Sequence, residues 1–292
     1  MNRHVRRATA ACALGALALG LAGCGGATSS GVPGATRPAD SPKASPHASP
    51  KPKATPKPTL APGPGGTTPV FERGAATKER TVALTFDADM TADQGARARA
   101  GERFDNPQLV NTLRKLKVPA TVFMTGRWAE EYPAEAKDIG RDRLFEVANH
   151  SYSHYAFTGD CYGLPRVPER GMRADVDRAF SAFRKAGVEH VVPYFRFPGG
   201  CYDRAALRAL TPTGVTAVQW DVVSGDAFAT DAGAVTQQVL DGVRPGSVVV
   251  MHCTRSAAPT TERVVRAVVP RLRAKGYRFV RVSDLVGAAR GA

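Results

Sequence analysis

A regular alternation of short apolar runs and helical patterns begins near residue 77, and it restricts the fold of this chain more than any other feature. Seven runs have the length and composition of buried strands, at residues 81–86, 120–124, 143–148, 193–197, 215–220, 248–251 and 278–282. Helical patterns lie between most of them, for example over residues 234–243 and 263–275. Such alternation indicates a parallel α/β architecture, and the pattern alone fits a barrel or a doubly wound sheet.

Chemically versatile side chains stand at the carboxyl ends of these runs. They are Asp87, Asp89, His150, Arg196, Asp221 and His252. The carboxyl ends of parallel strands meet at one edge of the fold, and active sites are built there. We therefore expect these side chains to gather into one site.

The segment His150-Ser-Tyr-Ser-His154 places two imidazoles four residues apart, so both can bind one metal ion if the segment is helical. The nearby Thr85-Phe-Asp-Ala-Asp89 supplies two carboxylates. One would complete a two-histidine, one-carboxylate site with an open position for water, and the other would act as a general base. The alternatives are a pair of surface or capping histidines and a polar turn in which Asp89 caps the next element.

Two further features complete the expected site. Arg196-Phe-Pro-Gly-Gly200 places an arginine at a strand end before Gly199 and Gly200, which allow backbone N–H groups to point into a site as an oxyanion hole requires. His252 ends an apolar strand at the catalytic edge, which favours a general acid. The alternatives are a βα turn with a surface arginine and a histidine satisfied within the core.

Five motifs in this order resemble the polysaccharide deacetylase family with the NodB homology domain, carbohydrate esterase family 4, over about residues 80–285. Besides the motifs above, Pro119-Ala-Thr-Val-Phe-Met-Thr-Gly126 with Arg127-Trp128 resembles the family's second strand, and Asn149-His-Ser-Tyr-Ser-His154 resembles its metal motif. The resemblance implies a distorted (β/α) barrel of about seven parallel strands with surrounding helices. It also implies metal-assisted hydrolysis of N-acetyl groups, usually with Zn²⁺, while Co²⁺ or Ni²⁺ suit the same nitrogen and oxygen ligands.

The resemblance also implies a role for individual residues. Asp87 matches the catalytic base, Arg196 the arginine that orients it, and His252 the general acid. His150 and His154 match metal ligands. The acidic residue that supports the general acid is best matched by Asp226, with Asp221 as the second candidate; Trp220 would lie near the sugar or fill the core.

This chain departs from the family pattern at three positions. Ala88 stands where a second, metal-binding aspartate is expected, and we predict that Asp89 takes over as the ligand because an alternating strand points residues 87 and 89 to the same side. Otherwise the metal would bind through two histidines and water. Gly199 replaces an aromatic residue and Ala227 replaces a tryptophan, which predicts a more open groove that grips sugar less by stacking.

The N-terminus predicts export. A basic start and an apolar run indicate a signal peptide at residues 1–23, and Leu21-Ala-Gly-Cys24 resembles the lipobox of bacterial lipoproteins, with Cys24 lipidated. Half of the 22 prolines lie in residues 25–69, which predicts a disordered linker over residues 24–76 before a catalytic domain at 77–292. We expect a lipid-anchored protein at the outer face of the cell membrane and in the cell wall; the alternative is an ordinary secretory signal.

The net charge of +14 suits anionic wall polymers or a membrane surface, although a plain solvated surface explains it equally well. Nucleic acid is not an expected partner of an exported chain, and we expect a monomer. Cys161 and Cys201 follow strands that end at the same edge, so we predict a disulfide between them and a free Cys253. The competing pair is Cys201 with Cys253.

Together these features predict a metal-dependent deacetylase of a cell-wall polysaccharide, with peptidoglycan and chitin-like amino sugars as the open substrate classes. One rival is a glycoside hydrolase that uses Asp87 and Asp226 as its carboxylate pair, which would leave the histidine pair unexplained. The other is a non-catalytic, sugar-binding wall lipoprotein that lost its metal through Ala88.

Overall fold

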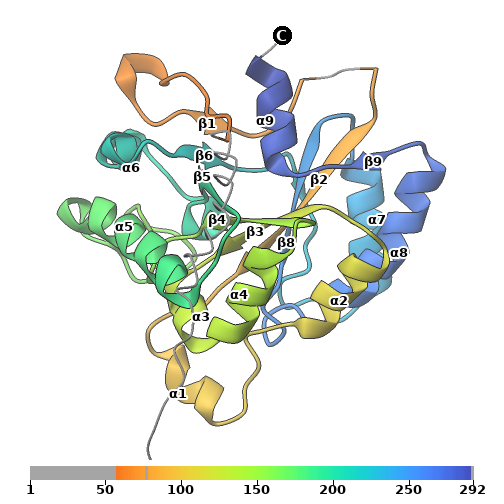
Figure 1. Ribbon diagram of the computed structural model, residues 1–292, viewed down its shortest axis with the longest axis horizontal. Helices are drawn as coiled ribbons and strands as arrows, with labels where there is room; N and C mark the ends of the chain where they lie inside the picture. Colours follow the sequence, from red (N-terminus) through yellow and green to blue (C-terminus); the bar gives the residue numbers. More distant parts are fainter. Residues whose placement is uncertain (1–56, 76–77, 291–292) are drawn as a thin grey trace, which may run out of the picture. The chain divides into compact units, whose positions relative to one another are not determined.

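The computed structural model describes residues 57–75 and 78–290 as one nine-stranded sheet of parallel strands covered by helices (Figure 1). The strands are β1 Val70–Phe71, β2 Thr81–Ala88, β3 Ala120–Met124, β4 Phe145–Asn149, β5 Val191–Phe195, β6 Thr216–Val218, β7 Val222–Val223, β8 Ser247–His252 and β9 Arg278–Phe279. The helices are α1 Gln94–Arg99, α2 Pro107–Lys115, α3 Gly126–Glu131, α4 Pro133–Arg141, α5 Glu169–Ala186, α6 Arg204–Leu210, α7 Ala232–Gly242, α8 Thr261–Ala274 and α9 Val282–Arg290.

The sheet curls into a half-barrel of the expected (β/α) type. Its strand order is β1-β6-β5-β4-β3-β2-β8-β7, and β9 pairs with the start of β2. Within the described residues β1 and β7 form the two ends of this order, so the barrel is open between them. Seven of the helices form two contacting groups, α2 with α7 and α8, and α3 with α4, α5 and α6 (Figure 1).

Alternate residues of the strands pack into different layers. In β2, Leu84, Phe86 and Ala88 belong to the large core between the sheet and its helices, whereas Ala83 belongs to a smaller core on the other face of the sheet. Side chains of α9 complete this smaller core, which fills the inside of the curl. Both faces of β2 are therefore buried, as expected for a central parallel strand.

All seven expected strands are present, although their ends shift by a few residues. The sequence pattern missed β1 and β7, because a two-residue strand has no detectable periodicity. The condition that His150–His154 is helical is not met: this segment is a loop in which Ser151 and His154 have φ of 67° and 56°. No helix in the described residues is long and apolar enough to cross a membrane.

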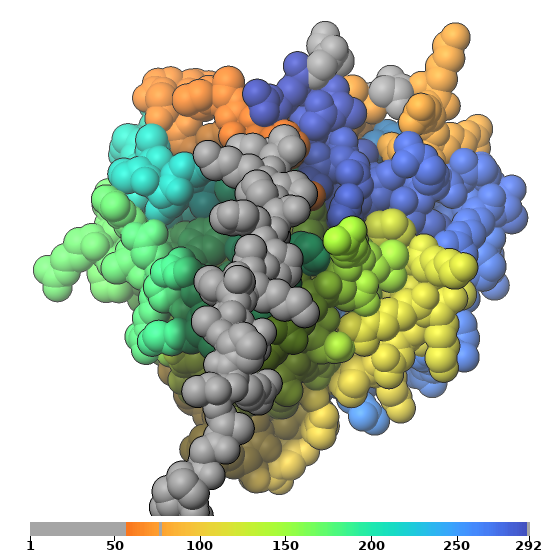
Figure 2. Space-filling view, in the orientation of Figure 1, coloured from red at the N-terminus to blue at the C-terminus, as the bar shows by residue number. Residues whose placement is uncertain are grey.

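Residues 57–75 pack against the rest of the domain instead of continuing the expected linker to residue 76. Val70 and Phe71 pair with β6, and the Leu60 N–H donates to the Thr216 hydroxyl over 3.3 Å. Figure 2 shows this segment at the surface beside α6 and α9. The expected boundary at residue 76 lies later than the observed one, because prolines surround the few apolar residues that anchor the segment. The expected signal peptide, Cys24 and residues 24–56 of the linker lie outside the described residues.

Candidate active site

The expected catalytic side chains lie on the inner face of the curled sheet because of strand parity. Ala83 in β2, Ala148 in β4 and Val248 in β8 belong to the inner core. Asp87, His150 and His252 follow these residues at even spacing on the same strands or just beyond them, so they point inward at the carboxyl edge. Arg196 follows the inward-facing Tyr194 of β5 in the same way.

Asp87 and Arg196 form a fully buried ion pair. The Arg196 Nη1 lies 2.6 Å from the Asp87 Oδ1, and its Nε and Nη2 donate to the carbonyls of Val218 and Gln219. Burial alone would raise the pKa of Asp87, but the charge of Arg196, aided by two nearby histidines, holds it below its usual range. Asp87 is thus a carboxylate fixed in one orientation and kept ionised, as a general base requires.

Asp89, His150 and His154 form a group whose ligand atoms lie within 4.8 Å of one another. The Asp89 Oδ1 is 3.5 Å from the His150 Nε2 and 3.7 Å from the His154 Nε2, too far for hydrogen bonds. The expected displacement of the ligand from position 88 to Asp89 agrees with this geometry, because Ala88 packs in the outer core.

The chemistry of this group fits a divalent cation. The Asp89 Oδ1 is buried without a hydrogen-bond partner, and burial raises the pKa of this carboxyl above its usual range, so the ionised form lacks a counter-charge. Burial lowers the pKa of His150, and that of His154 to about 4, which keeps both imidazoles neutral as metal ligation requires. The His150 Nδ1 lies 2.9 Å from the Arg196 carbonyl, which leaves its Nε2 lone pair directed at the group.

The loop that carries both histidines is held by hydrogen bonds rather than by helical structure. The Asn149 side chain accepts from the Ser151 N–H at 2.8 Å and donates to the Val176 carbonyl. Asp175, on α5, accepts from the Tyr152 N–H at 2.6 Å and from the Ser153 N–H at 3.4 Å. These contacts keep Ser151 and His154 in the left-handed backbone region that aims the two imidazoles together.

His252 is held by Asp226, the first of the two candidates that the sequence offered for this role. The His252 Nδ1 and backbone N–H both lie 2.8 Å from the Asp226 carboxylate, which also accepts from Ser224 and Thr261. Burial lowers the pKa of His252, but the hydrogen bond and charge of Asp226 outweigh it and raise the pKa to about 10. His252 is therefore protonated at neutral pH and can donate a proton.

Asp221, the second candidate for supporting the general acid, bonds the start of β8 and not His252. Its carboxylate accepts from the Val248 N–H at 2.7 Å and the Ser247 hydroxyl at 2.8 Å, at the start of β8. His252 ends this strand, roughly 16 Å further along at about 3.3 Å per residue. The Asp221 carboxylate instead fixes the start of the strand that carries His252.

The Gly199–Gly200 turn requires both glycines. Their φ values are 65° and 74°, and a Cβ on Gly199 would lie 2.5 Å from the Cys161 sulfur, while one on Gly200 would lie 2.4 Å from the Trp220 ring. The Gly200 N–H donates to the Phe197 carbonyl at 2.8 Å, so it cannot serve as an oxyanion donor while that bond is made. Trp220 is half-buried with its ring 5.3 Å from the Arg196 guanidinium carbon, which places it beside the arginine that holds Asp87.

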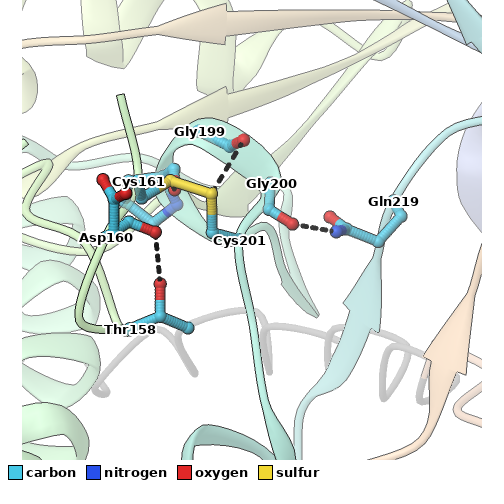
Figure 3. Close-up of a disulfide and its surroundings, with 8 residues drawn as sticks. Thr158, Asp160, Cys161, Gly199, Gly200, Cys201 and Gln219 are labelled. Carbon is cyan, nitrogen blue, oxygen red and sulfur yellow. Dashed lines mark hydrogen bonds between the residues drawn. A yellow bond between two sulfur atoms is a disulfide. The ribbon is translucent and has the colours of Figure 1, made fainter. Parts of the chain in front are cut away.

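The Cys161–Cys201 disulfide ties the loop after the metal motif to this turn (Figure 3). The two Cα atoms lie 5.9 Å apart, and the Gln219 side chain donates to the Gly200 carbonyl from the neighbouring strand. Cys253 is free and buried in the outer core, on the side of β8 opposite to His252. Strand parity therefore keeps it away from Cys201.

Several supporting residues escaped the sequence reasoning. The Thr254 hydroxyl accepts from the Asp89 N–H at 2.9 Å and so fixes the start of the turn after β2. Asp175 supports the loop of residues 150–154, called the metal loop below, from a helix distant in the chain. Thr261 does the same for Asp226, the partner of His252. Hydroxyl and carboxylate residues of this kind occur throughout the sequence, and no local pattern distinguishes them.

Comparison with known proteins agrees with this geometry. Residues 74–218 match the family model described as polysaccharide deacetylase. A chitooligosaccharide deacetylase of Azorhizobium caulinodans is 28% identical over 187 residues, covering 59% of this chain and 83% of that protein. A peptidoglycan-N-acetylglucosamine deacetylase of Bacillus cereus is 28% identical over 206 residues, covering 70% of this chain and 67% of that protein.

Solved structures give the same result. The crystal structure of the Bc1960 peptidoglycan N-acetylglucosamine deacetylase superposes with a TM-score of 0.62 at 25% identity. The match covers 75% of this chain and 92% of that chain. This chain therefore contains a polysaccharide deacetylase domain of carbohydrate esterase family 4, the NodB homology domain, and it is an N-deacetylase that hydrolyses amide bonds.

Proposed function

We propose that this enzyme removes N-acetyl groups from the amino sugars of a cell-wall polysaccharide and depends on a divalent metal held by Asp89, His150 and His154. One observation carries the proposal: the partly buried group of three ligand atoms lies beside an ionised carboxylate fixed by Arg196 and a protonated imidazole fixed by Asp226. Base, cation site and acid are the three parts that hydrolysis of an unactivated amide needs.

The proposed mechanism assigns one task to each side chain. A divalent cation held by the three ligands would supply Lewis acidity toward the acetyl carbonyl. Asp87 takes a proton from the attacking water, and Arg196 keeps its carboxylate ionised and oriented for that transfer. His252 then protonates the leaving nitrogen, which would otherwise depart as a poor amide anion. Two neutral imidazoles and one carboxylate suit Zn²⁺, with Co²⁺ and Ni²⁺ as compatible ions.

The substrate class rests on the relatives and on the expected export. Proteins with similar sequences are named as deacetylases of chitooligosaccharides and of peptidoglycan N-acetylglucosamine. A lipoprotein signal at residues 1–23, followed by a lipidated Cys24, would place the domain next to the wall, which supports peptidoglycan as the first substrate to test. If Cys24 is the anchor, Cys24→Ser should move the protein out of the membrane fraction or leave its precursor uncleaved.

Acetate release from purified peptidoglycan and from N-acetylglucosamine oligomers tests the function directly. We expect release that stops with a chelator and returns when Zn²⁺ is added, with mass mapping showing the sugar that lost an acetyl group. Shortened oligosaccharides that keep their acetyl groups would instead favour the glycoside hydrolase. Glycan binding without product, in a protein that holds no metal, would favour the sugar-binding lipoprotein.

A further inference from the structure

Two aromatic side chains stand almost fully in solvent beside the active site. Across the described residues the exposed large hydrophobic side chains are Tyr162 at 87%, Phe228 at 82% and Val223 at 53%. A single exposed hydrophobic residue is ordinary on a protein surface. Both aromatic residues, however, share a strained backbone and a position at the catalytic edge, and these two properties together call for a function.

The backbone strain is concentrated at this edge. Tyr162 and Phe228 have φ of 52° and 58°, a region that aromatic residues rarely adopt. Two of the three other non-glycine residues with positive φ in the described chain, Ser151 and His154, belong to the metal loop. Asparagine or glycine would fit the two aromatic positions with less strain, so the structure keeps a ring at a conformational cost.

Tyr162 is fixed beside the turn that follows Arg196. It directly follows Cys161, whose disulfide joins Cys201, and its Cδ2 lies 3.2 Å from the position of a Cβ on Gly199. The Leu164 N–H closes this short loop by donating to the Cys161 carbonyl at 3.0 Å. The exposed ring is thus held on a cross-linked loop rather than on a free surface segment.

Phe228 is fixed beside the residue that supports the acid. Its N–H donates to the Ala257 carbonyl at 2.6 Å, and the following Ala229 N–H donates to the Asp226 carbonyl at 3.1 Å. These two bonds fold the loop after β7 tightly around Asp226. The ring therefore belongs to a residue only two positions after Asp226, the partner of His252.

The two rings lie on opposite flanks of the reacting centre. Tyr162 belongs to the loop after β4 and is bound to the loop after β5, whereas Phe228 follows β7. In the strand order β5-β4-β3-β2-β8-β7, the base on β2 and the acid on β8 lie between these loops. A linear chain that crosses the site from one flank to the other would pass both of the loops that carry these rings.

We propose that Tyr162 and Phe228 are stacking platforms for pyranose rings on either side of the sugar that is deacetylated, so that the enzyme favours an oligomer over a single amino sugar. This inference rests on the proposed function. The C–H face of a pyranose is apolar and slightly positive, and it packs on the negative face of an aromatic ring. A peptide or lipid ligand would not need two rigid rings spaced across a hydrolytic centre.

Tyr162→Asn and Phe228→Asn test this role because asparagine tolerates the left-handed backbone. We expect each variant to melt at or above the wild-type temperature and to bind metal as the wild type does. For an N-acetylglucosamine pentamer, KM should rise about 5- to 10-fold with kcat nearly unchanged, the size of one lost aromatic contact. The effect should be smaller for the dimer. Tyr162→Phe and Phe228→Tyr should restore the wild-type KM, and Val223→Ala serves as a non-aromatic exposed control.

The outcomes separate this inference from the proposed function. If the wild type releases acetate and both asparagine variants keep its KM for the pentamer, the stacking role of the two rings is wrong. The proposed deacetylase function is then unaffected. If the wild type releases no acetate, calorimetric binding of the pentamer still tests the rings, since stacking requires no turnover. Equal affinity of wild type and variants in that measurement would overturn the inference as well.

Discussion

Asp87 and Asp89 are two residues apart, yet their surroundings shift the pKa values of their carboxyl groups in opposite directions. Arg196 contacts Asp87 and its charge lowers the pKa of that group against burial, whereas burial raises the pKa of Asp89. Asp89 also leaves one oxygen buried and unpartnered. One carboxylate is therefore satisfied by the protein, and the ionised form of the other lacks a counter-charge, which the proposed cation would supply.

This difference predicts separable effects of two substitutions. Asp89→Asn should weaken metal affinity by more than about 10-fold, because it removes the charged ligand and its hard oxygen. Asp87→Asn should keep the metal and lower kcat by roughly 10²- to 10⁴-fold, because the base is lost. Metal content after dialysis and acetate release measure the two effects. An Asp89→Asn enzyme that binds metal and turns over like the wild type would show that the ligand is assigned wrongly.

The proposed acid, His252, depends in the same way on one neighbour, Asp226. In Asp226→Asn the charge that offsets burial is gone, so the pKa of His252 should fall from about 10 toward values at which the imidazole is neutral. The alkaline limb of the kcat profile should then move to lower pH, and kcat should drop roughly 10²-fold or more.

Asp221→Asn is the matched control for this prediction, because Asp221 bonds the start of β8 and not His252. It should lower stability without moving the pH profile. A shift of the alkaline limb in Asp221→Asn, or none in Asp226→Asn, would contradict the assignment.

At the scale of elements, strand parity places the proposed catalytic groups. Helix α5 holds the loop that carries His150 and His154. Each site residue at the end of β2, β4, β5 and β8 continues the inward-facing series of its strand. The metal loop after β4 has no such regular continuation. It depends on the Asp175 carboxylate, which reaches from α5 to two backbone N–H groups between the histidines.

Asp175→Ala should therefore loosen both histidines at once and weaken metal affinity by about 10- to 100-fold, as for other residues that orient ligands. Asp175→Asn should be milder, since its amide oxygen can still accept. Asp177→Ala is the control, because Asp177 is exposed on the same helix and its carboxylate pairs with Arg173 along the helix surface. Competition with a metal-binding dye gives the affinities, and equal values for the two alanine variants would refute the role of Asp175.

At the scale of the whole molecule, stability depends on a carboxyl group outside the catalytic centre. Burial, with the nearby Asp105 carboxylate, raises the pKa of Glu135 to about 8, and one of its oxygens is buried without a partner. Because the folded pKa exceeds the ordinary 4.5, the folded state holds this proton more tightly than the unfolded state. The stability supplied by the protonated group is complete below pH 4.5 and is lost as pH rises to about 8.

Glu135→Gln should remove this dependence. Relative to the wild type, the variant should gain on the order of 1 kcal/mol of unfolding free energy at pH 9, after allowance for solvent screening, and gain little at pH 4. Urea denaturation at both pH values measures the difference. A gain of equal size at the two pH values would mean that packing, and not the charge of Glu135, causes it.

Local residue patterns were sufficient to predict much of this molecule. Seven of its strands could be located because apolar composition is a local property, and the edge that carries the site followed because parallel strands end together. The period of two along β2 also indicated that Asp89, and not position 88, shares a side with Asp87. None of these inferences needed a long-range contact.

Long-range packing decided the rest. The choice of Asp226 over Asp221 as partner of His252 depends on how the loop after β7 folds against β8, and the position of Cys253 depends on which face of β8 meets the helices. The metal loop is held in a non-helical shape by Asp175, 25 residues after His150 along the printed sequence. The free energy of such a contact is set by residues distant in the chain, so no local window of sequence contains it.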